Sequence, residues 1–242
     1  MSGPLARLSS YFDRLKKTAP ELHAGLKSMI SDFAKMGVAL TTTAKMVGHL
    51  TRAVREARDA AAAEINLVIA SSYQGDTPDQ IATRTARLKK LAFDTSKDVT
   101  GTMADIEKAF AAAFDMGVTE EKLRGGVGRA GALLADAMSV DKTLGIKSIS
   151  KLGDLFGVQG GNNLTALGDV LAQSKQVSGF TDFASFLHEM NRAGPVIARY
   201  GGDASGASLL LAGVSRIREE GSGTAVEAFF RELNDPAKGK LV

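Results

Sequence analysis

The most regular pattern of apolar and polar positions in the chain lies between residues 22 and 54. Apolar residues recur there at alternating steps of four and three, and the single polar exception is Thr43. This is the spacing of a helix whose seam packs against another helix in a left-handed coiled coil. The predicted self-association seam consists of Leu22, Leu26, Met29, Phe33, Met36, Leu40, Val47, Leu50 and Val54. We therefore predict that residues 1–73 form a coiled-coil-like helical rod.

The spacing shows that this seam is buried, but it does not show what covers it. One interpretation is self-association between copies of the chain. The bulk of Phe33 and Phe12 favours a trimer or hexamer over a tight dimer. The other interpretation is an antiparallel hairpin within one chain, with the seam packed against residues 80–115. The pattern is predicted to continue more weakly toward the C-terminal end of the rod through Ala57, Ala61, Glu64 and Val68.

Beyond Tyr73 the pattern changes to shorter amphipathic helices separated by turns that contain glycine. Residues 139–163 are expected to be less regular, with one short helix near 150–156, because five glycines interrupt them. A helix over 183–199 is expected to kink or split at Gly194-Pro195. The predicted helix N-caps are Thr77, Thr102, Thr119, Thr181, Asp203 and Thr224.

No stretch of sustained two-residue alternation appears, which favours an all-α class. We predict a long N-terminal heptad-patterned helix followed by a multi-helix, bundle-like domain over residues 74–236. A basic tail over residues 237–242 completes the predicted organisation.

The composition narrows the possible classes of protein. Of the 242 residues, 44% are apolar, so a sizeable core can be buried. The absence of cysteine excludes disulfides and thiolate metal sites. No apolar run approaches the roughly 20 residues of a membrane-spanning helix, so no membrane span is expected in this chain. The formal net charge of +3 does not indicate a specific nucleic-acid partner.

None of the motifs in the chain indicates catalysis. Residues 126–131 match G-x-G-x-x-G, but the polar, helix-like run 120–124 precedes them where a dinucleotide site needs a strand. We interpret these glycines as a flexible joint or as a small-residue face that lets two helices approach closely. His188 and Glu189 are expected on a solvated helix edge. Of Glu120 and Glu121, one is expected to act as a capping charge and the other to be solvated. We expect no enzyme activity, no catalytic residue, no metal and no cofactor.

Four segments in the second half resemble, in order and spacing, the conserved helical domain of phage tail tape measure proteins. The first is the connector 94–100, followed by a helix rich in small residues that runs to 117–121. The second is the helix 183–198 with its Gly-Pro-Val step, and the third is the Leu- and Ala-rich helix 203–221. The closing helix 223–236, which ends in Leu-Asn-Asp-Pro, is the most specific of the four.

This resemblance implies a structural protein of a phage or phage-like tail. Such a protein sets the length of the tail tube and is released when the DNA is ejected. It would lie in the lumen of the virion tail after assembly in the bacterial host cytoplasm. The implied partners are tail-tube proteins, baseplate or tail-tip proteins and tail assembly chaperones. The alternative hypothesis is an intracellular helical adaptor, or a self-associating coiled-coil interaction protein.

Overall fold

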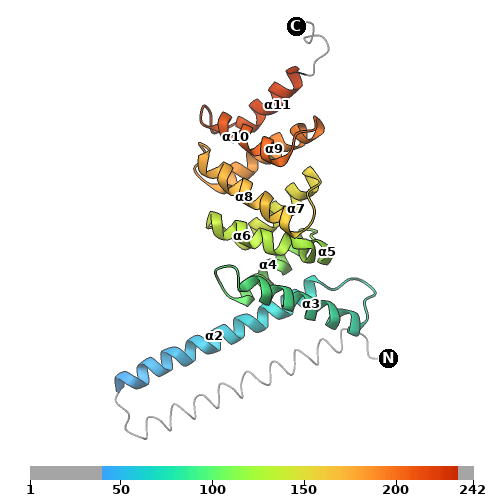
Figure 1. Ribbon diagram of the computed structural model, residues 1–242. Helices are drawn as coiled ribbons and strands as arrows, with labels where there is room; N and C mark the ends of the chain where they lie inside the picture. The colour runs from blue at the N-terminus through green and yellow to red at the C-terminus, as the bar shows by residue number, and fades with distance from the viewer. Residues whose placement is uncertain (1–39, 234–242) are drawn as a thin grey trace. The chain divides into compact units, whose positions relative to one another are not determined.

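The computed structural model of the protein describes residues 40–233, with the backbone alone for residues 40–51, 53 and 54 (Figure 1). Every regular element in this part of the chain is helical, which confirms the all-α class. No helix among the described residues is long and apolar enough to cross a bilayer. The elements are α2 (Leu40–Ala70), α3 (Pro78–Ser96), α4 (Met103–Asp115), α5 (Glu120–Lys122), the π-helical turn η1 (Leu123–Val127), α6 (Gly128–Met138), α7 (Lys142–Phe156), α8 (Gly161–Val177), α9 (Phe183–Arg199), α10 (Ala204–Ser215) and α11 (Ser222–Leu233).

The chain divides into two compact units. Among the described residues, the first takes in 40–62 together with 76–80, and the second takes in 63–75 and 81–233. Helix α2 spans this boundary, so its last two turns, from Ala63, belong to the second unit.

Within the second unit the helices stack in two rows (Figure 1). In one row, α4 packs against α7, α7 packs against α9, and α9 packs against α11. In the other row, α6 packs against α8, and α8 packs against α10. Successive helices such as α6 and α7 lie in different rows and pack against each other. Each helix thus packs mainly on its near neighbours in sequence, which is the arrangement of an α-solenoid.

A continuous apolar core runs through this stack, and much of it consists of alanine and glycine. The closest approach between helices lies where α6 crosses α7. A Cβ added to Gly131 would lie 2.6 Å from the backbone nitrogen of Ile146, and a Cβ added to Gly145 would overlap the carbonyl oxygen of Gly131. Gly128, in the same G-x-G-x-x-G segment, lies against the ring of Phe110. The prediction of a small-residue face that allows close helix contact is therefore confirmed.

Two expectations about helix continuity were wrong. Residues 142–156 form the single regular helix α7, because Gly145 and Gly153 serve packing and do not interrupt the helix. Helix α9 runs unbroken through Pro195, so the helix does not split there, while the alternative expectation of a kink stays a prediction. Gly194, the residue before this proline, lies against Leu155 and Phe156 of α7, where a Cβ would be 2.8 Å from Leu155 Cδ2.

Most of the predicted N-caps are confirmed. Thr77 and Gln80 form a capping box, with Thr77 N donating to Gln80 Oε1 at 2.8 Å. Thr102, Thr119 and Asp203 also cap their helices.

Two cap predictions were wrong. Asp182 caps α9 in place of Thr181, because its carboxylate accepts from the Ser185 N–H at 2.7 Å. Helix α11 begins at Ser222, so Thr224 lies inside the helix.

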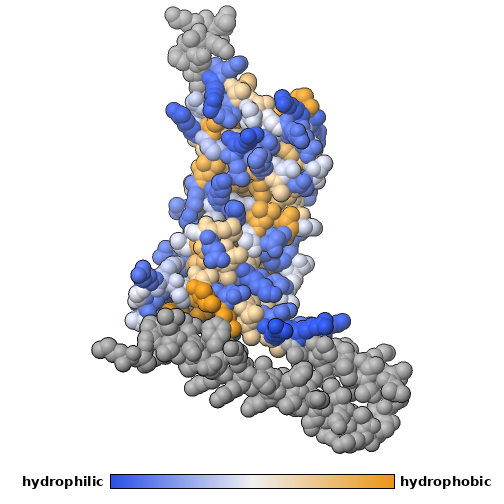
Figure 2. Space-filling view, turned by 180° about the vertical axis from the view of Figure 1, so that it is seen from behind, coloured by the Kyte–Doolittle hydropathy of each residue, from blue (hydrophilic) through white to orange (hydrophobic). Residues whose placement is uncertain are grey.

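The surface of the second unit is mixed. Figure 2 shows orange, hydrophobic residues that reach the surface between blue, hydrophilic ones. The exposed large apolar side chains are Ile69, Tyr73, Phe93, Met116, Val177, Tyr200, Leu209, Ile217 and Phe229.

Candidate functional site

The predicted self-association seam lies mostly outside the described part of the chain. Leu22, Leu26, Met29, Phe33 and Met36 precede residue 40. Leu40, Val47, Leu50 and Val54 fall within α2, for which only the backbone is described at these positions. The seam therefore stays a prediction. The structure shows instead how the C-terminal end of this helix is held.

The last two turns of α2 are built into the core of the second unit. Ala63 and Leu67 are fully buried, and Leu67 joins the core that contains Leu88 and Ala92 of α3. A salt bridge of 3.0 Å between Glu64 and Lys89 lies beside this contact. We call this group of contacts, with the polar contacts described next, the α2 anchor.

The predicted continuation of the seam along α2 is not the face that the single chain buries. Ala57 is exposed, and Ala61, Glu64 and Val68 are only half-buried. The buried positions are Ala63, Leu67 and Ser71, which follow steps of four. The continuation of the seam, as a contact between copies, stays a prediction.

Arg84 of α3 closes the end of α2. Its Nη1 donates to the carbonyl oxygen of Ser71 at 2.6 Å, and its guanidinium lies 4.4 Å from the centre of the Tyr73 ring. A cation at this position interacts favourably with the partial negative charge at the C-terminal end of a helix.

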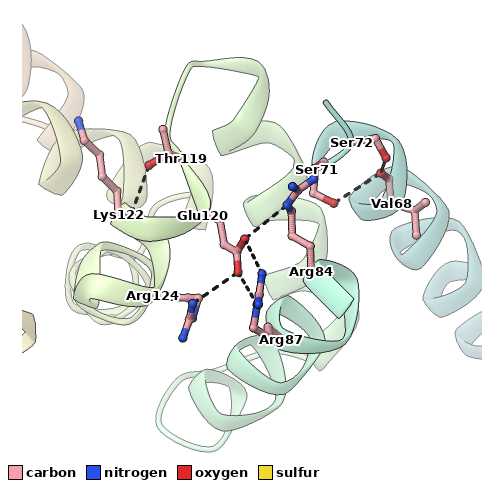
Figure 3. A network of polar contacts seen from close by, with 9 residues as sticks. All are labelled: Val68, Ser71, Ser72, Arg84, Arg87, Thr119, Glu120, Lys122 and Arg124. Carbon is pink, nitrogen blue, oxygen red and sulfur yellow. Dashed lines mark hydrogen bonds and ion pairs between the residues drawn. The ribbon is translucent and has the colours of Figure 1, made fainter. Parts of the chain in front are cut away.

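Glu120 of α5 contacts Arg84 and Arg87 of α3 and Arg124 of η1, so it links these three elements (Figure 3). Arg87 of α3 binds both carboxylate oxygens, with Nε to Oε1 at 2.7 Å and Nη2 to Oε2 at 3.2 Å. Arg84 Nε lies 3.4 Å from Oε2, and Arg124 Nη1 of η1 lies 3.6 Å from Oε1. The side chains of Glu120 and Arg84 are only 12% and 13% exposed, so this carboxylate is the partly buried centre of three guanidinium groups. We call these four residues the Glu120 cluster.

The expectation for Glu120 and Glu121 was therefore incomplete. Thr119 supplies the cap of α5, and Glu121 is exposed as expected. Glu120 sits in the first turn, where its charge suits the helix dipole, and it also joins α3 to η1. The spacing of Arg84 and Arg87 on one face of a helix was a signal in the sequence. Their partner lies 33 residues beyond Arg87, so the spacing alone did not identify it.

A buried carboxyl group lies near the anchor. Glu107 of α4 is 3% exposed, and its Oε1 has no hydrogen-bond partner. Burial raises the pKa of Glu107; the positive charge of Lys89 lowers it, and the negative charge of Glu64 raises it. A group whose pKa is raised by folding contributes stability below its unfolded pKa, and that contribution is lost as the pH rises through the folded value. Burial of Glu107 therefore costs stability once the pH lies above the pKa of this group in the unfolded chain.

We expect Glu107→Gln to stabilise the protein at pH 7 by on the order of 1 kcal/mol, because glutamine keeps the shape of the side chain and removes a group whose charged form is disfavoured by burial. At pH 4 the difference from the unmodified protein should shrink, because Glu107 is then increasingly protonated in the unfolded chain as well as in the folded one. Urea unfolding followed by circular dichroism at both pH values measures this. Asp115→Asn, at the exposed end of the same helix, is the control and should change stability by less than about 0.5 kcal/mol. An equal gain at both pH values would contradict the prediction.

A cavity of about 810 Å³ opens beside α9, lined among others by His188, Glu189, Arg192 and Arg218. The prediction that His188 and Glu189 share a solvated edge is half right. His188 is exposed, but Glu189 is buried and accepts the Gly223 N–H at 2.6 Å, so it fastens α11 to α9. No group of three or more possible metal ligands occurs among residues 40–233.

The α2 anchor holds the last two turns of α2 within the second unit. Apolar burial, a capped helix end and a shared carboxylate fix one helix to the start of a helical stack. Residues 89–241 match the family model described as phage-related minor tail protein. No curated protein and no solved structure matches the chain significantly.

Proposed function

Because the chain belongs to the phage-related minor tail protein family, we propose that it is the tape measure of a phage or phage-like tail, or the part of one that carries the helical domain. In this role the heptad helix of residues 22–54 associates with other copies through its seam, as a trimer or hexamer. The resulting rod lies in the tail lumen and serves as a template for tube polymerisation in the host cytoplasm. It leaves the tube when the DNA is ejected.

The family match over residues 89–241 is the observation that carries this proposal. The matched region begins within α3 and takes in the helical stack that follows. The heptad pattern of residues 22–54 precedes the matched region in sequence, and the end of α2 and the start of α3 lie between them. This order is the one expected of an extended helix attached to a folded domain. Among the possible roles of a tail protein, the resemblance of the segments over 94–236 to tape measure proteins supports that of a tape measure.

The α2 anchor gives the proposed rod a fixed end. A helical rod can set the length of a tail tube only if one of its ends is held in place. Leu67 secures this end by apolar burial, and Arg84 holds the terminal carbonyl of Ser71. Tail-tube proteins, baseplate or tail-tip proteins and tail assembly chaperones are the partners that this role requires.

Deleting residues 22–35 should shorten the tail. The deletion removes two heptads and places Met36 at the position of Leu22, so the seam from Met36 to Val54 is kept in register. At 1.5 Å per residue the rod loses roughly 21 Å, and the tube should lose the same length. Electron microscopy of tails assembled with this variant measures the change.

The control for this deletion is the triple substitution Met29→Asp, Met36→Asp and Leu40→Asp, which keeps the length of the chain but breaks the seam. We expect it to reduce the number of tails without producing a shorter class. Tails of unchanged length after the deletion, together with no binding of the purified protein to tube or baseplate proteins, would exclude a tape measure. Binding to a foreign coiled coil by a monomeric chain would then favour the adaptor function.

A further inference from the structure

Helix α10 has an outward face that carries no charge. None of its residues from Ala204 to Ser215 is charged. Its inner side is buried, and Ser208 there bonds to Ser174 of α8 at 3.0 Å. On the outer side Leu209 is 58% exposed, although a leucine at such a position usually gains by burial.

Four residues of α10 have the arrangement of a packing hole. Gly206, Leu209, Leu210 and Gly213 fall at positions i, i+3, i+4 and i+7, which together surround one inserted side chain in coiled-coil packing. Gly206, Leu209 and Gly213 are exposed, and Leu210 is half-buried against the core. A Cβ added to Gly213 would meet nothing within 4 Å, and one added to Gly206 would meet only the carboxylate of Asp203, at 3.2 Å. We call these four residues the α10 face. A leucine from another helix fits such a hole.

The ends of α10 determine which helix fits best. Asp203 caps the N-terminus and Arg216 lies at the C-cap, and both are exposed. If a second α10 packs antiparallel about a centre between Leu209 and Leu210, Asp203 of each copy lies opposite Arg216 of the other. The two helix dipoles are then also antiparallel, which is favourable. We infer that the α10 face binds the α10 face of a second copy of the chain in this antiparallel arrangement.

This contact is compatible with copies that point the same way. The helices of the second unit lie across the direction in which they succeed one another (Figure 1). A rotation by 180° about an axis along the stack reverses the direction of α10. It leaves unchanged the direction in which the helices succeed one another. The contact involves different residues from the seam of residues 22–54, and it does not depend on the tape measure proposal.

The test uses the full chain with the seam broken by Met29→Asp, Met36→Asp and Leu40→Asp, so that only other contacts can associate. Sedimentation equilibrium should detect a dimer. Adding Leu209→Glu should weaken this dimer by at least roughly tenfold, because it places a charge in each hole. The matched control is Ile217→Glu, since Ile217 is 90% exposed and lies outside the α10 face. It should leave the dimer unchanged.

A protein that stays monomeric with the seam broken, at concentrations up to about 100 μM, would overturn the inference. So would equal effects of Leu209→Glu and Ile217→Glu. Unchanged circular dichroism of both variants shows that they are folded. Loss of the dimer with normal tail length would leave the tape measure proposal standing, so the two proposals can fail separately.

Cross-linking tests the antiparallel arrangement. The chain has no cysteine, so Ser205→Cys and Gly213→Cys each introduce one reactive thiol. In an antiparallel pair, position 205 lies near position 213 of the other copy. A short bismaleimide should therefore join a tagged Ser205→Cys chain to an untagged Gly213→Cys chain far more than either chain to itself. Preferential joining of identical chains would indicate parallel packing and overturn the arrangement.

Discussion

Gly145→Ala should destabilise the second unit by about 3 kcal/mol. The new methyl group would overlap the carbonyl oxygen of Gly131 and lie 2.9 Å from Cβ of Ala135, so α6 and α7 would have to separate. Overpacking of a well-packed core typically costs 1–3 kcal/mol and sometimes more. The higher helix propensity of alanine offsets less than about 1 kcal/mol of this loss of stability. The midpoint of urea unfolding, followed by circular dichroism, measures the loss.

The control for Gly145→Ala is Gly125→Ala. A Cβ at Gly125 meets nothing within 4 Å, so only the backbone effect of the substitution remains. We expect a change of less than about 1 kcal/mol there. If both variants unfold at the same urea concentration, the two helices tolerate separation and the close approach is not important for stability.

Glu120→Ala should cost about 2–4 kcal/mol, because Arg84, Arg87 and Arg124 then lose the partly buried carboxylate that they share. Arg87, whose side chain is 46% exposed, can return to water, so it adds little to the loss. Since Arg84 also holds the end of α2 through Ser71, hydrogen exchange should speed up in residues 63–75 as well as in α5. Thermal unfolding and exchange mass spectrometry report these two effects.

The neighbouring residue provides the control for this substitution. Glu121→Ala removes an exposed carboxylate from the same short helix and should change stability by less than about 0.5 kcal/mol. If Glu120→Ala and Glu121→Ala behave alike, the Glu120 cluster is not an important contact.

Helix class and most helix starts could be predicted because they depend on neighbouring residues. The capping box of Thr77 and Gln80, for example, is complete within four residues. The regularity of α7 could not be predicted, because a glycine within a helix has the same sequence signature as a glycine that ends one. Only the contact of Gly145 with Gly131 on another helix distinguishes the two cases. Local propensity loses to tertiary packing at such positions.

The candidate site could be predicted only in part for the same reason. Arg84 and Arg87 were not singled out from the sequence, because the carboxylate that brings them together comes from a distant part of the chain. The burial of Glu189 depends on a backbone N–H of α11, 34 residues further on. The heptad spacing of residues 22–54 indicates a buried seam without indicating its partner. The burial of Ala63 and Leu67 in the core of the second unit is visible only in the folded chain.

The two-row stacking of helices has a consequence for how the domain yields to force. Because each helix rests mainly on its neighbours in sequence, the stability of the stack is close to a sum of local contributions. A chain pulled from one end therefore resists with a series of small, separate barriers, where a globular domain of similar size resists with a single large one. Such a protein can be drawn out through a narrow opening helix by helix, at a steady low tension.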